Sequence, residues 1–169
     1  MCGIALRRLA ADDIHPTAGS DLYERLLGAW SIQSEWYEGD KKRTGRGEWY
    51  FERTIGGRGV QDVLFAAGSE PEGYGTSIRT YDTESDDWHI VWMQPKSREF
   101  AAFIGRSDSR DGIVQTGRSL RSDLDGVLRW SFVDITSSKF TWLGETSTDG
   151  GVTWDLEQKM EATRIYESK

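Results

Sequence analysis

Apolar and polar residues alternate with a period of two along most of the chain from residue 28 onward. In the first such run, Trp30, Ile32 and Trp36 share one face while polar side chains occupy the other, which is typical of a half-buried β-strand. Short segments rich in Gly, Asp, Ser and Pro separate the runs, as in hairpin loops. The predicted strands are 28–38, 47–55, 60–67, 74–82, 87–94, 98–105, 112–118, 126–135, 138–146 and 152–165.

No amphipathic run is long enough to supply the crossover helices of a parallel sheet. About ten antiparallel strands in up-and-down order would leave two exposed edges in an open sheet, and closure into a barrel removes both edges. We therefore predict an all-β fold, an up-and-down antiparallel β-barrel with a short N-terminal helix. Ser20 or Asp21 can cap this helix, which ends at Gly28. Residues 1–19 are predicted to form an N-terminal arm, and 20–169 the barrel domain.

Composition and charge narrow the choice of partners and compartment. The net charge of -7 argues against nucleic acid, because the one basic cluster, Lys41 to Arg43, lies beside turn residues and is interpreted as a solvated turn. A single cysteine, Cys2, allows no intrachain disulfide and favours a reducing compartment. No long apolar run indicates a membrane span or signal peptide. The sequence therefore predicts a soluble cytoplasmic protein without a membrane or nucleic-acid partner.

The opening of the first strand resembles the calycin superfamily. Gly28-Ala29-Trp30 matches the G-x-W strand that follows a short helix in lipocalin-like barrels, and Arg164 matches their late arginine. The resemblance implies that Trp30 plugs one end of the barrel beneath the Arg164 guanidinium. Segments 56–63, 74–82 and 140–145 are also similar to a bacterial family of uncharacterised calycin-type domains. That family implies a fold and no established activity.

A small closed barrel can hold one ligand in its interior. Candidate ligand contacts are the aromatic and amide side chains that the alternation directs inward. Gln61 is included as well, because the pattern does not decide which face of its strand points inward. These residues are Trp36, Gln61, Trp92, Gln94, Gln115, Trp130, Trp142 and Gln158. A buried amide can equally be satisfied by a neighbour or by trapped water. The tryptophans, including Trp49, Trp88 and Trp154, are first of all predicted core.

One carboxylate is a candidate for catalysis. Asp62 is predicted to face inward with Leu64, where it could act as a general base with Arg79 stabilising a developing oxyanion. The alternative is a structural ion pair between Asp62 and either Arg79 or Arg53. The sequence leaves these alternatives open.

Metal and cofactor chemistry finds little support in the sequence. Only His15 and His89 are present, and the alternation around His89 directs it outward, so neither a haem nor a zinc site is expected. The Met1-Cys2-Gly3 opening resembles amidotransferases with an N-terminal cysteine nucleophile, but the chain lacks the asparagine that those enzymes use at their oxyanion site. No cofactor is predicted.

Three functions remain compatible with these patterns. The first is binding of a small apolar or aromatic molecule in the barrel cavity, and the second is a cofactor-independent isomerase, cyclase or dehydratase that uses Asp62 and Arg79. The third is a structural domain whose own tryptophans fill the barrel, which an interior cavity of less than about 300 Å³ would favour. The oligomeric state is open, and a homodimer is possible.

Overall fold

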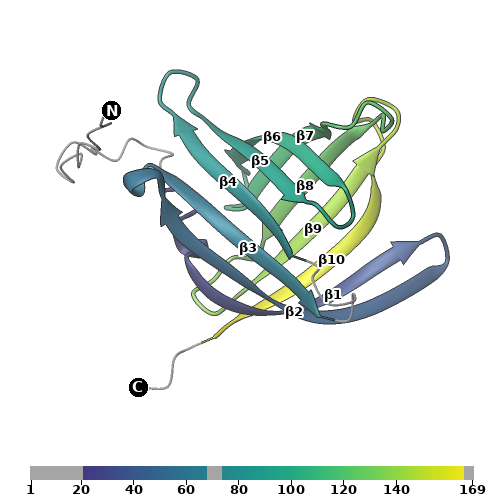
Figure 1. The fold of residues 1–169 in the computed structure, drawn as a ribbon, viewed down its shortest axis with the longest axis horizontal. Coiled ribbons are helices and arrows are strands. Elements are labelled where there is room, and N and C mark those ends of the chain that lie inside the picture. Colours follow the sequence, from purple (N-terminus) through teal and green to yellow (C-terminus); the bar gives the residue numbers. More distant parts are fainter. Residues whose placement is uncertain (1–20, 68–73, 166–169) are drawn as a thin grey trace, which may run out of the picture.

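A computed structural model describes residues 21–67 and 74–165, which form a closed antiparallel β-barrel (Figure 1). Each strand pairs with the next along the chain, and β1 pairs with β10 to close the barrel. The predicted all-β, up-and-down architecture is therefore confirmed. The strands are β1 (Gly28–Glu38), β2 (Lys41–Thr54), β3 (Gly59–Ala67), β4 (Tyr74–Asp82), β5 (Asp87–Gln94), β6 (Glu99–Ser107), β7 (Ile113–Ser119), β8 (Val127–Val133), β9 (Lys139–Ser147) and β10 (Asp155–Arg164).

The predicted N-terminal helix is wrong. In its place the chain forms one short 3₁₀ turn, η2 (Glu24–Leu26). Another 3₁₀ turn, η3 (Ile55–Gly57), joins β2 to β3. The Leu27 N–H donates to the Glu24 carbonyl in the 3₁₀ pattern, and strand β1 starts at the next residue. The predicted arm, 1–19, lies outside the described residues. Within the described segments, no helix has the length and apolar character needed to cross a membrane.

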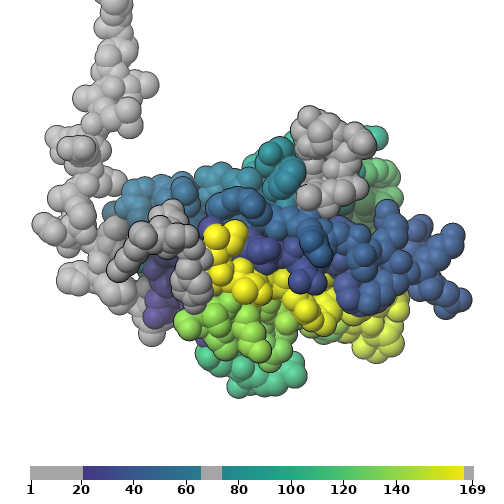
Figure 2. All heavy atoms as spheres, turned by 90° about the horizontal axis from the view of Figure 1, so that it is seen from below, coloured from purple at the N-terminus to yellow at the C-terminus, as the bar shows by residue number. Residues whose placement is uncertain are grey.

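Strand β2 begins six residues before its predicted start at residue 47, so the interpretation of the basic cluster as a turn is wrong. The cluster pairs with the end of β1 in a long hairpin, in which Lys42 lies opposite Tyr37. The Lys42 ammonium also lies 2.6 Å from a Glu35 carboxylate oxygen. The hairpin extends beyond the body of the barrel (Figures 1 and 2).

Strand β10 starts later than predicted and contains an irregularity. The Asp149 carboxylate accepts hydrogen bonds from the backbone N–H groups of Val152 and Thr153, each at 2.9 Å, which holds these residues in a turn. A register shift between Leu156 and Gln158 then reverses the direction of the side chains that precede it, so that Leu156, which was predicted to face inward, is exposed. Trp154 consequently lies outside the core, 4.0 Å beneath the Arg129 guanidinium, and its predicted place in the core is wrong.

One end of the barrel is closed by Trp30, as the resemblance implied. The indole is fully buried and donates to the Leu26 carbonyl at 2.7 Å. The Arg164 guanidinium lies 4.0 Å from the indole ring centroid and donates to the carbonyls of Arg25, Leu27 and Ser137. Arg164 therefore ties the turn η2 and the β8–β9 connection over the plug.

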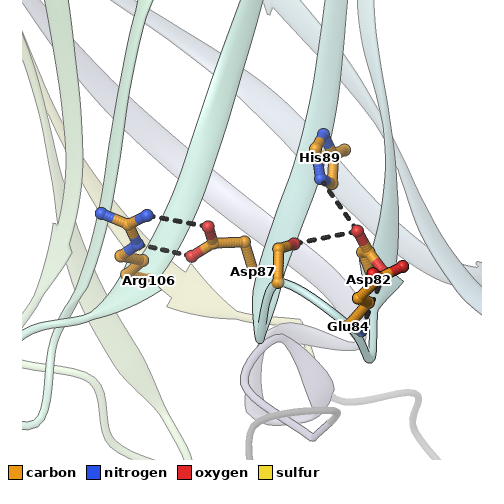
Figure 3. A network of polar contacts seen from close by, with 6 residues as sticks. Asp82, Glu84, Asp87, His89 and Arg106 are labelled. Atoms are coloured by element: carbon orange, nitrogen blue, oxygen red, sulfur yellow. Dashed lines mark hydrogen bonds and ion pairs between the residues drawn. The ribbon is translucent and has the colours of Figure 1, made fainter.

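Polar contacts also hold the β4–β5 hairpin at this closed end (Figure 3). Asp87 accepts two hydrogen bonds from Arg106, at 2.5 and 2.8 Å, and these bonds lower the pKa of the Asp87 carboxyl. Asp82 accepts the Glu84 N–H at 3.0 Å, which lowers its pKa as well. His89 faces outward, as predicted, with its Nε2 3.7 Å from Asp82. These groups lie on the wall outside the core.

Candidate functional site

The end of the barrel opposite Trp30 opens into a cavity of about 470 Å³. A second hollow of about 400 Å³ adjoins it and shares four indoles with it. These are Trp36, Trp92, Trp130 and Trp142, which lie on β1, β5, β8 and β9. A cavity of this size argues against the predicted alternative in which the protein's own tryptophans fill the barrel.

Strand register explains why these residues meet. Trp36 pairs with Gln158, which pairs with Gly144, and Gly144 pairs with Trp130, so their side chains share one row on the inner face. Three of the four indoles also contact one another at steep angles. Trp130 lies 5.5 Å from Trp92 and 5.4 Å from Trp142 between ring centroids, with interplanar angles of 85° and 63°. Trp92, Trp130 and Trp142 therefore form three connected aromatic walls.

Glycines behind two of these rings keep the cavity open. A Cβ atom added at Gly75 would lie 2.0 Å from the Trp92 ring, and one at Gly144 would lie 2.5 Å from the Trp142 ring. Each indole therefore lies against a wall position that has no side chain. Any larger residue there would displace the ring toward the interior.

The close approach of Trp92 to Gly75 makes Gly75→Ala a test of this arrangement. We expect the variant to displace the Trp92 ring and to lower the free energy of unfolding by about 1–3 kcal/mol, the usual cost of overpacking. Urea unfolding and near-UV circular dichroism of the tryptophans measure the two effects. Val91→Ala, on the outer face beside Trp92, is the control and should leave the spectrum unchanged. An unchanged spectrum in Gly75→Ala would contradict the arrangement.

A buried ion pair lies at the floor of the cavity. Asp62 on β3 and Arg79 on β4 form a salt bridge, and their side chains are 0% and 1% exposed. The second carboxylate oxygen of Asp62 accepts the Ser77 N–H at 3.2 Å. Of the two predicted roles for Asp62, the ion pair with Arg79 is thus observed. Only Arg79 lines the cavity, and Asp62 is not among the residues that line it.

Aromatic rings enclose the other side of Arg79. Its guanidinium carbon lies 5.0 Å from the centroid of the Tyr23 ring and 5.7 Å from that of Phe51. Complete burial raises the pKa of the Tyr23 hydroxyl, although the positive charge of Arg79 opposes this shift. Tyr23 is consequently neutral and separates the ion pair from the closed end.

Several buried polar atoms near the floor have no hydrogen-bond partner among the described residues. They include two groups that can only donate, the Trp49 Nε1–H and the Arg79 Nε–H, and both residues line the cavity. The amide of Gln115 is fully buried and both of its polar atoms also lack a partner within the described chain. Gln115 pairs in register with Trp130, whose indole is one of the cavity walls. Buried groups of this kind are rare in folded proteins and require an explanation.

Most of the predicted ligand contacts come together at this site. The predicted contacts that line the cavity are Trp36, Trp92, Gln94, Trp130, Trp142 and Gln158, and Arg79, which was predicted as a catalytic or ion-pair residue, lines it with them. Gln115 is buried beside the lining. Gln61 was predicted wrongly, because it lies on the outer face and donates to the Thr76 hydroxyl at 3.2 Å. Its neighbours Val60 and Asp62 take the inward positions on β3.

Sequence reasoning missed several other residues that line the cavity. Ser77 alternates in phase with predicted inward residues, so the period-two pattern could have indicated it. Trp49, predicted as core, is in the core and also lines the cavity. Arg43 was missed because it was assigned to a turn. Glu99 follows the loop at the open rim, where it accepts the Trp92 indole N–H at 3.4 Å, and no pattern marked it.

No group of three or more potential metal ligands occurs within residues 21–67 and 74–165. Comparisons with known proteins identify the fold of the chain and no family. No family model and no curated protein matches the chain.

Two solved structures share the architecture. Rv2717c from M. tuberculosis is similar over 90% of this chain and 100% of its own, with 14% identity and a TM-score of 0.63. The S-type phycobiliprotein lyase CPES from Guillardia theta is similar over 88% of this chain and 93% of its own, with 8% identity and a TM-score of 0.61. The chain thus shares the closed antiparallel barrel fold of these two proteins, whereas the resemblance to one bacterial family is not shown.

Proposed function

We propose that the protein binds a small aromatic molecule in the barrel cavity. The observation that carries this proposal is the set of four indoles, Trp36, Trp92, Trp130 and Trp142, that line both the cavity and the hollow beside it. Ligand pockets are commonly lined by aromatic side chains with a few polar groups that fix orientation. Gln94 and Gln158 are two of the polar groups at this lining. A cytoplasmic location, predicted from the sequence, belongs to the same proposal.

Binding is favoured over the alternative of an enzyme that uses Asp62. A general base must reach the proton it abstracts, directly or through one water molecule. Arg79 and Ser77 occupy the Asp62 carboxylate, and Arg79 is the member of the ion pair that lines the cavity. Asp62 therefore serves in this proposal to hold and neutralise Arg79.

A pair of tryptophan variants tests the proposal. Trp130 stands between Trp92 and Trp142, so Trp130→Ala should weaken binding of an aromatic probe, β-acetonaphthone, by about tenfold, which corresponds to the stacking energy of one ring. Trp154→Ala removes an indole from the outer surface and should leave the affinity unchanged. Isothermal titration calorimetry and native mass spectrometry measure the affinity and the stoichiometry.

Equal affinities in Trp130→Ala and Trp154→Ala would place the bound probe outside the cavity and contradict the proposal. No binding of any naphthalene probe by the wild-type protein would also contradict it.

A further inference from the structure

The floor of the cavity restricts the chemistry of what it can hold. We infer that the ligand is a neutral aromatic molecule with a hydrogen-bond acceptor, such as an aromatic ketone or amide, and that this acceptor enters first, toward Arg79 and Trp49. The inference rests on the proposed function and deepens it by naming the class of ligand.

The donors at the floor call for an acceptor. The Arg79 Nε–H and the Trp49 Nε1–H cannot accept hydrogen bonds, and neither has an acceptor among the described residues. Both residues line the cavity, and both side chains are almost completely buried. A ligand oxygen at the floor would be the partner that these groups lack, whereas a hydrocarbon would leave them unpaired.

The charge at the floor argues against an anion. Asp62 already neutralises Arg79, and both side chains are withdrawn from water. A ligand carboxylate at the floor would bring a second negative charge close to Asp62, with Arg79 as the guanidinium beside it. Arg43, the other arginine of the lining, is exposed and pairs with Trp36 in the β1–β2 hairpin. In a site of low dielectric constant, this repulsion and the loss of hydration outweigh the gain from Arg79. A carbonyl oxygen accepts the same hydrogen bonds without adding charge.

The distribution of aromatic residues sets the orientation. Trp49 packs deep in the barrel, with its ring centroid 5.5 Å from Phe132 and 5.8 Å from Phe140. The other indoles of the lining, such as Trp92, also line the second hollow near the open rim. There, Glu99 accepts the Trp92 N–H. A ligand with its acceptor at Trp49 would thus place its ring body among the indoles nearer the mouth.

Three naphthalenes substituted at the β position test the inference on the intact wild-type protein. Acetonaphthone carries a neutral acceptor, ethylnaphthalene has a similar shape without one, and naphthoate is an anion. We expect acetonaphthone to bind at least about tenfold more tightly than either of the others, the value of one buried hydrogen bond. Calorimetry at constant ionic strength gives the three affinities.

The outcomes separate the two proposals. Equal binding of acetonaphthone and ethylnaphthalene, or tighter binding of naphthoate, would overturn the inference and leave the aromatic cavity standing. Failure of all three to bind would overturn the proposed function itself.

Two variants locate the preference at the floor. Trp49→Phe keeps the ring and removes the N–H, so the preference for acetonaphthone over ethylnaphthalene should fall several-fold, up to about tenfold, while both still bind, and an unchanged preference would overturn the role of Trp49. Asp62→Asn leaves Arg79 with its positive charge uncompensated, so it should reverse the order and favour naphthoate over acetonaphthone. An unchanged order in Asp62→Asn would overturn the charge argument. Should Asp62→Asn fail to fold, the wild-type selectivity and Trp49→Phe decide alone.

Discussion

Replacement of Arg79 by methionine is expected to lower the free energy of unfolding by about 3–5 kcal/mol, the usual cost of removing one member of a buried ion pair. Asp62 would remain fully buried with its negative charge uncompensated. The loss exceeds what the pair itself contributes, because a charge without a partner cannot be solvated inside the barrel. Urea unfolding followed by tryptophan fluorescence measures the loss.

The double variant Asp62→Leu, Arg79→Met separates these two effects. Replacing both members of a buried pair by apolar residues is often neutral or stabilising, so most of the lost stability should return. Arg121→Met is the matched control, because Arg121 also pairs with an aspartate, Asp123, whose side chain is 63% exposed and stays in water when the arginine is lost. Its loss should be much smaller, as for other surface ion pairs. A loss in Arg79→Met no larger than in Arg121→Met would contradict the assignment of a buried charge pair.

The period-two pattern is sufficient to assign side chains to the interior where the strands are regular. Each side chain on a regular strand faces opposite to its neighbours, so Trp30, Trp92 and Trp130 could be assigned to the interior from alternation alone. The late arginine and its place over Trp30 followed from the resemblance. The closed order of strands followed from the number of hairpins and the absence of crossover helices.

The pattern fails where the backbone departs from regular alternation. The register shift before Gln158 reverses the direction of the preceding side chains, which is why Trp154 was assigned to the core and lies outside it. On β3, polar residues occupy both faces, and the pattern could not decide between Gln61 and Asp62. The alternation also gives no account of Gly75, whose role depends on contact with Trp92 across the neighbouring strand.

Stability and binding are assigned to opposite ends of the barrel. The closed end is made of Trp30, the turn η2 and the Arg164 guanidinium that connects them, while the cavity lies among indoles at the other end. At the closed end, the Arg164 guanidinium donates to three backbone carbonyls. Near the cavity floor, the Trp49 N–H has no partner within the described residues. This contrast supports a structural role for the first end and a binding role for the second.

Arg164→Met tests that division, and we expect it to lower the free energy of unfolding by about 2–4 kcal/mol, because hydrogen bonds from a charged donor are worth more than neutral ones. The variant keeps an unbranched chain over Trp30 but loses bonds to the carbonyls of Ser137 and Leu27, both at 2.6 Å, and Arg25, at 3.1 Å. Arg164→Lys keeps the charge but not the planar fork, so it should recover only part of the loss.

Neither Arg164→Met nor Arg164→Lys should change the affinity for acetonaphthone at a temperature where the variant is folded, because Arg164 lies at the end opposite the cavity. Urea unfolding and calorimetry on the same preparations give stability and affinity separately. A loss of affinity as large as that of Trp130→Ala would show that the plug and the binding end are coupled. A stability equal to that of the wild type would show that the three carbonyls are satisfied without Arg164.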